Sequence, residues 1–283
     1  MLGYEIHIDI SLEYEMQIHS VTRNMVLLAL IVISFFPYAY SQATQPIAKD
    51  PQAVSLLGQV LNVAGGLPAI TTVRDFMAKG KITLYHSPQD ESGTVTIKGR
   101  GMEQFRMEVS LPEGVRTAVA DRGTAWTKET DGKVHSLLNQ RVDFAGSIYF
   151  PFEEIANWLA DSKVNISDLG ITTVDGKSLH AIRARKNFLR QDDPMGTRGK
   201  LSETELLVDP TDSLLIQTSD KVTTRSGYEP KVPHSLIFSD YRKVDGVLFA
   251  FSVVEEIYHQ RTVVIQFDQV TFNTGLNDSD FEN

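Results

Sequence analysis

The chain has 283 residues, 42% of them hydrophobic, which is enough for one large β domain or two small ones with a real core. Its formal charge of −9 argues against a nucleic-acid partner, because neutralising phosphates takes clustered lysine and arginine. The chain has no cysteine, which excludes disulfides, thiolate catalysis, cysteine-ligated metal clusters and a lipid attached to an N-terminal cysteine.

An apolar run near the N-terminus, residues 25–36, is followed by the small residues Ser41 and Ala43. Its length and flanks fit a secretory signal peptide better than a membrane span, which needs about 20 apolar residues. We therefore predict a signal peptide over residues 1–43, cleaved after Ser41 or Ala43, and a periplasmic protein with no membrane span after cleavage. An uncleaved anchor is the alternative.

The first fifteen residues are acidic, whereas the start of a signal peptide is normally basic. A start at Met16 would instead give a short leader with Arg23 just before the apolar run. We therefore expect translation to begin at Met16 or Met25.

Two amphipathic helices are expected. Asp50 and Pro51 are typical of a helix start, and apolar residues recur at helical spacing until the glycines at 65 and 66. A second apolar stripe, which includes Ile155, follows Pro151. Because a helix with one apolar face needs a cover, both helices should lie on a sheet.

Strand patterns dominate after residue 71, and residues 94–138 show them best. Phe105, Met107 and Val109 alternate there with polar residues, which is the period of a half-buried strand. Asp-Gly pairs at 131–132, 175–176 and 245–246 mark tight hairpin turns. The pattern predicts a mainly β (α+β) antiparallel fold of about eleven strands in a single domain over residues 44–283.

Residues 247–254 are apolar on both faces of their predicted strand, whereas a sheet with one solvated face alternates cleanly. The second face must therefore also meet apolar material. Core packing under the helices is one interpretation, and an apolar cavity between sheet and helices is the other.

The chain carries no recognisable catalytic or metal-binding motif. Nucleophile elbows, phosphate loops and dinucleotide fingerprints are missing from the sequence. Glu255 and Glu256 point to opposite faces of a strand and cannot form a carboxylate pair. The five histidines after residue 43 lack metal-ligand spacing: His86, His135, His180, His234 and His259. We predict a protein that is not an enzyme and that has no cofactor and no metal.

The central part of the chain carries a series of short motifs. A strand with a basic residue leads to a Phe-containing strand and a proline, then to a Gly-containing turn and a tryptophan strand, and a tail ends in Phe. These segments are Lys98-Gly99-Arg100, Phe105-Arg106-Met107-Glu108, Pro112, Ala120-Asp121-Arg122-Gly123, Trp126 and residues 270–281. Together they resemble the LolA/LolB-like periplasmic lipoprotein carriers. Arg122 is an insertion relative to the family pattern, and Arg100 sits one residue out of register.

The resemblance implies a strongly curved antiparallel sheet, or incomplete β-barrel, with two or three helices covering its concave face. A lipid or a lipoprotein acyl chain would bind in the apolar cavity between them, as in a lipoprotein carrier. The expected lining residues are Phe105, Met107, Trp126, Phe249, Phe251, Leu57, Leu61 and Ile155. Arg100 matches the arginine that helps to hold the lid closed in the carriers, which makes it the expected polar lid contact.

A second interpretation comes from RseB, a periplasmic regulator with a domain of similar fold. It implies a sensor or interaction module that binds an envelope protein partner. The polar loops at residues 190–200 and 225–232 would then form the contact surface.

Overall fold

A computed structural model describes residues 48–85, 89–136, 142–222 and 232–282. The predicted signal peptide and its cleavage site lie outside the described residues and stay predictions. In the described part, no helix is both long and apolar enough to cross a membrane.

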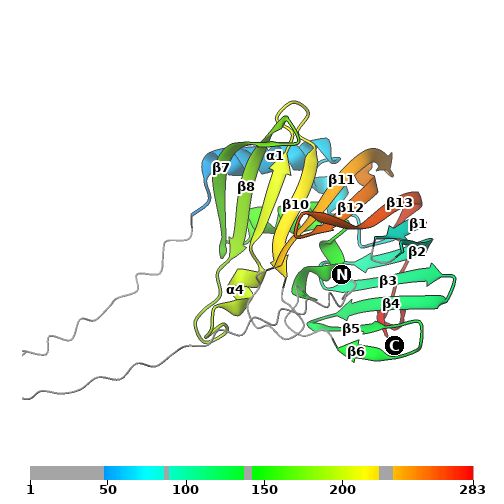
Figure 1. Cartoon of the computed structure of the whole chain (residues 1–283). Helices are drawn as coiled ribbons and strands as arrows, with labels where there is room; N and C mark the ends of the chain where they lie inside the picture. The colour runs from blue at the N-terminus through cyan, green and yellow to red at the C-terminus, as the bar shows by residue number, and fades with distance from the viewer. Residues whose placement is uncertain (1–47, 86–88, 137–141, 223–231, 283) are drawn as a thin grey trace, which may run out of the picture. The chain divides into compact units, whose positions relative to one another are not determined.

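Thirteen strands, counted over the described residues, form one antiparallel sheet in the order β6-β5-β4-β3-β2-β1-β13-β12-β11-β10-β9-β8-β7. The sheet is strongly curved and open, because β6 and β7 at its two ends do not pair (Figure 1). The mainly β class is thus confirmed. The expected count of about eleven strands is too low, since each alternating run forms a strand of its own.

The strands of the first half are β1 (Asp75–Leu84), β2 (Glu91–Arg100), β3 (Gln104–Leu111), β4 (Gly114–Asp121), β5 (Thr124–Lys128) and β6 (Val134–Ser136). Those of the second half are β7 (Val164–Val174), β8 (Lys177–Lys186), β9 (Thr204–Val208), β10 (Leu215–Val222), β11 (Val232–Val244), β12 (Val247–Ile257) and β13 (Gln260–Phe272). Every pairing joins strands that follow one another along the chain, except that of β1 with β13.

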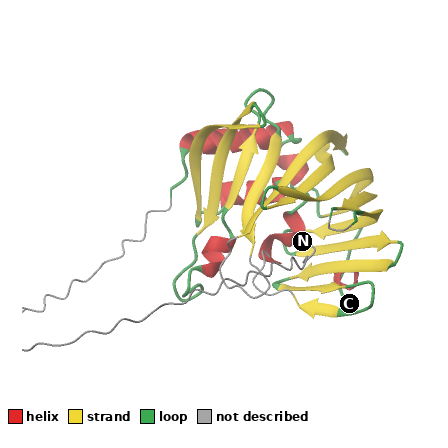
Figure 2. Cartoon of the chain, in the orientation of Figure 1, coloured by secondary structure: helices red, strands yellow, loops and turns green. Residues whose placement is uncertain are grey.

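The helical elements are α1 (Pro51–Val63), α2 (Leu67–Ile70), α3 (Phe152–Ala160), α4 (Thr197–Leu201) and the short 3₁₀ helices η1 (Val142–Ser147) and η2 (Asp278–Phe281). Asp50 caps α1 by accepting hydrogen bonds from the backbone N–H groups of Gln52 and Ala53, as its sequence predicts. Figure 2 shows α1, α3 and η1 within the curve of the sheet. The prediction that helices cover the concave face is therefore confirmed.

Phenylalanine rings fill the centre of this inner face. Phe249 lies 5.5 Å from Phe76 and 5.7 Å from Phe267 between ring centroids, and Phe150 lies 5.4 Å from Phe272. These five residues, here called the aromatic block, join β1, β12 and β13 to the segment between η1 and α3. Gly99 of β2 makes room for the block, because a Cβ there would overlap the ring of Phe76.

Candidate functional site

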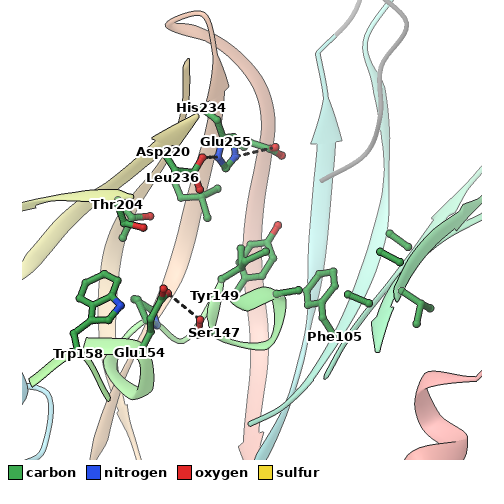
Figure 3. Close-up of a pocket in the computed structure, with 18 residues that line it drawn as sticks. Phe105, Ser147, Tyr149, Glu154, Trp158, Thr204, Asp220, His234, Leu236 and Glu255 are labelled. Atoms are coloured by element: carbon green, nitrogen blue, oxygen red, sulfur yellow. Dashed lines mark hydrogen bonds and ion pairs between the residues drawn. The ribbon is translucent and has the colours of Figure 1, made fainter. Parts of the chain in front are cut away.

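A pocket opens beside the aromatic block, between the inner face of the sheet and the η1–α3 segment (Figure 3). Its volume is about 70 Å³, which is room for roughly five to seven waters. Its described lining comes from both halves of the sheet: Phe105, Ala118, Val119, Ala120, Ala125, Ala145, Ser147, Ile148, Tyr149, Pro151, Glu154, Trp158, Thr204, Thr218, Asp220, His234, Leu236 and Glu255.

Small side chains create the apolar end of this pocket. Ala120 pairs with Phe105 on one side and with Ala125 on the other, so two methyl groups stand where a packed core would carry large residues. Tyr149 forms the opposite wall, with its ring stacked 6.0 Å from that of Phe105. Burial and the nearby Glu255 carboxylate raise the pKa of Tyr149 well above its usual value, so its hydroxyl stays neutral.

A buried histidine between two carboxylates forms the polar end. His234 Nδ1 lies 2.8 Å from Asp220 Oδ1, and His234 Nε2 lies 3.2 Å from Glu255 Oε1. The sheet register explains the cluster, because Asp220 of β10 pairs directly with His234 of β11, and Glu255 of β12 pairs with the neighbouring Leu236. Burial lowers the pKa of His234, but the hydrogen bonds to Asp220 and Glu255 outweigh it and raise the pKa to about 9. The imidazole is therefore a cation at neutral pH.

Two further polar groups complete this end. Thr204 of β9 is 2% exposed, and its hydroxyl has no hydrogen-bond partner among the described residues. Ser147 donates a hydrogen bond of 3.0 Å to Glu154 Oε2, which joins η1 to the first turn of α3 (Figure 3). The pocket thus combines an apolar wall on β3–β5 with a hydrogen-bonding wall on β9–β12, which is here called the polar wall.

Of the nine residues predicted for the site, the structure places Phe105 in the lining of this pocket. Six others are buried elsewhere beneath the helices or in the sheet: Met107, Phe249, Phe251, Leu57, Leu61 and Ile155. Phe249 belongs to the aromatic block, with the ring of Phe251 6.3 Å away. Contact of any of the seven with a ligand stays a prediction.

Arg100 and Trp126 lie on the other face of the sheet. Phe105 pairs with Gly99 on one side and with Ala120 on the other, and Ala120 pairs in turn with Ala125. Arg100 and Trp126 each follow one of these inward positions and therefore point the opposite way. Trp126 packs there against a small cluster that contains Leu276 and Phe281. Both belong to residues 273–282, which follow β13 and are here called the C-terminal segment.

Arg100 forms an ion pair with the C-terminal segment. Its guanidinium lies 2.6 Å from Asp278 Oδ1, and that of Arg122 lies 2.7 Å from the same oxygen. Hydrogen bonds from Arg122, Arg100 and Gln104 lower the pKa of Asp278 to about 2. A role for Arg100 at a lid stays a prediction.

Sequence reasoning missed the polar wall. His234 looked like an isolated histidine, and Asp220 lies 14 residues away on another strand. One signal was available, because Glu255 interrupts the apolar side of β12 that carries Phe249, Phe251 and Val253. Over the described residues, no group of three or more histidine, aspartate and glutamate side chains is arranged to hold a metal ion.

The curved open sheet with helices on its inner face is a LolA-like fold, so the resemblance is confirmed at the level of the fold. A LolA superfamily protein from Nitrosomonas europaea superposes with a TM-score of 0.51 at 12% identity, over 82% of this chain and 97% of that one. A DUF1329 family protein from Desulfovibrio piger superposes with a TM-score of 0.52 at 12% identity, over 85% and 98% of the two chains. No family model and no curated protein sequence matches the chain.

Proposed function

We propose that the chain is a non-enzymatic periplasmic binding protein that holds a lipid or lipoprotein acyl chain between its curved sheet and its helices. The observation that carries this proposal is the pocket between the sheet and the η1–α3 segment. Its apolar end is lined by Phe105, Ala120 and Ala125, which are the kinds of side chain that hold hydrocarbon. Residues 1–43 supply the export signal in this proposal.

The energetics favour such a ligand. Each buried CH₂ group of a ligand contributes about 0.8 kcal/mol, so an apolar cavity can bind an acyl chain without any reacting group. The pocket as it stands holds only a short apolar segment. A longer chain requires the η1–α3 segment to move away from β3 and β4, which it contacts.

Native mass spectrometry of the protein, purified gently from an envelope fraction, tests the proposal. We expect a bound mass that matches a lipid, a fatty acid or an acylated peptide. A ligand-free protein that also fails to bind an apolar fluorescent probe such as N-phenyl-1-naphthylamine contradicts it.

The second candidate is an interaction module, and one observation favours it. Leu189 and Met195, next to and within the loop at residues 190–200, are 58% and 79% exposed. Exposed apolar side chains of this kind are typical of protein contact surfaces. The other predicted loop, residues 225–232, lies outside the described residues except for Val232. A stoichiometric protein partner in the native mass spectrum, lost when residues 190–196 are deleted, would replace the lipid proposal with this one.

A further inference from the structure

The charged cluster of the polar wall offers hydrogen-bond acceptors to a ligand. A protonated histidine has two N–H donors, and His234 donates one hydrogen bond to Asp220 and the other to Glu255. Ionised carboxylates only accept hydrogen bonds. A ligand group that needs to accept hydrogen bonds therefore finds no free N–H on His234.

Thr204 is an independent sign that a polar ligand atom belongs at this end. Its hydroxyl is buried, lines the pocket and has no partner among the described residues. Glu205 pairs with Ser219, so the next residues along the two strands, Thr204 and Asp220, lie side by side, which puts Thr204 next to the cluster. A buried hydroxyl without a partner is destabilising, and a ligand N–H at this place would satisfy it.

The charges of the lining point to the same kind of ligand. The charged side chains of the described lining are Glu154, Asp220 and Glu255 with the single cation His234, and this part of the lining includes no lysine or arginine. A carboxylate or phosphate head would meet acidic side chains in a site shielded from water, where like charges repel strongly.

We infer that the polar end of the pocket receives the amino group of a long-chain amphiphile, with the alkyl chain running toward the alanine-lined end. The ammonium group donates to the Thr204 hydroxyl and to the Asp220 carboxylate beside it, on the side of His234 that faces away from Glu255 (Figure 3). This inference rests on the proposed binding function and narrows its ligand from lipids in general to those with a cationic, hydrogen-bond-donating head.

Three ligands with the same twelve-carbon chain test this inference: dodecylamine, dodecanol and dodecanoic acid. Each is titrated into the full-length protein at submicellar concentration, and displacement of N-phenyl-1-naphthylamine is measured. We expect the amine to bind roughly tenfold or more tightly than the acid, because a hydrogen bond to a charged group contributes about that factor. The alcohol should fall between them.

Two variants identify the groups responsible. Thr204→Val keeps the shape of the side chain and should weaken dodecylamine several-fold without changing binding of the apolar probe. Asp220→Asn should reduce the preference for the amine over the alcohol. Thr96→Val is the matched control, since Thr96 is half-buried on β2 and is absent from the described lining. Thermal unfolding of each variant shows whether it is folded.

The outcomes separate this inference from the proposed function. If the acid binds as tightly as the amine, or if Thr204→Val and Thr96→Val behave alike, the inference fails and the apolar pocket stands. If the probe and all three ligands fail to bind the folded protein, the proposed function fails and the inference with it.

Discussion

The inner face of the sheet has two neighbouring regions that differ in what fills them. In the aromatic block, Phe76, Phe249, Phe267 and Phe272 project from adjacent strands, and Phe150 packs against them. In the pocket, the inward-facing positions of β4 and β5 carry alanines, and these small side chains leave a cavity. One sheet under one set of helices thus has a packed core beside an open pocket, and side-chain volume distinguishes the two.

The two regions also differ in polarity. The aromatic block is made of ring carbons alone, whereas the pocket buries His234, Asp220 and Glu255 together. Buried charges are stable only when they are paired and hydrogen-bonded. We therefore expect stability to depend on volume in the block and on pairing at the pocket, while ligand binding depends on the pocket alone.

The largest expected effect is on the block. Phe249→Ala removes a ring that contacts the four other rings of the block and leaves a cavity, which should lower the free energy of unfolding by about 3–5 kcal/mol. Urea unfolding followed by circular dichroism measures it. Phe188→Ala is the control, because Phe188 is half-buried beneath the Arg198 guanidinium and outside the block. Equal losses in the two variants would show that the block has no special weight.

The second effect is a pH dependence that belongs to the pocket. The pKa of His234 is about 9 in the folded state against 6.5 for an ordinary histidine, so its contribution to stability is fully present below pH 6.5 and is lost as pH rises through 9. The wild-type protein should lose about 3 kcal/mol of unfolding free energy across that window.

His234→Gln should be less stable at pH 6.5 and should lose most of this pH dependence, since it removes the titrating group and leaves Asp220 and Glu255 without their cation. Urea unfolding at pH 6.5 and pH 9 gives both quantities. His259→Asn, on an exposed turn, should behave like the wild type. A wild-type protein with equal stability at both pH values would mean that His234 is not held as a cation.

The third effect separates binding from stability. Ala120→Leu fills the pocket with three extra carbons and should abolish binding of N-phenyl-1-naphthylamine while changing the unfolding free energy by less than about 1 kcal/mol, because the new side chain enters existing space. Ala160→Leu, at the exposed end of α3, is the matched control and should bind the probe normally. Undiminished binding in Ala120→Leu would place the ligand elsewhere.

The smallest effect concerns the outer face. Asp278 is exposed and pairs with Arg100 and Arg122, and surface ion pairs of this kind are screened by water and salt. Asp278→Asn should lower the melting temperature slightly at low salt and not at about 0.5 M salt. A large, salt-independent loss would make the C-terminal segment a structural part of the sheet rather than a weakly held cover.

The strands and the two main helices could be predicted because they depend on local pattern. Period-two alternation around Phe105, Asp-Gly turns, and the Asp50-Pro51 start are all read within a few residues. The inward position of Phe105 follows from the same alternation. The division of the inner face into block and pocket does not, because it depends on which residues of distant strands become neighbours.

The polar wall and the outward Trp126 show this limit. Asp220 meets His234 only once the register of β10 with β11 is known, and no local pattern fixes that register. Trp126 can face outward because the C-terminal segment brings Leu276 and Phe281 to cover it, although they lie about 150 residues further along the chain. Such long-range cover is invisible to any short window of sequence.

The pairing of β1 with β13 also has a kinetic consequence. Every other pair of strands is a hairpin or a short-range neighbour and can form early, whereas this pair joins segments separated by nearly the whole domain. The aromatic block draws rings from both strands, so we expect it to be completed late in folding. A chain that emerges from its N-terminus first exposes the free edge of β1 until β13 arrives, and during that interval the edge is open to chaperones or to misassembly.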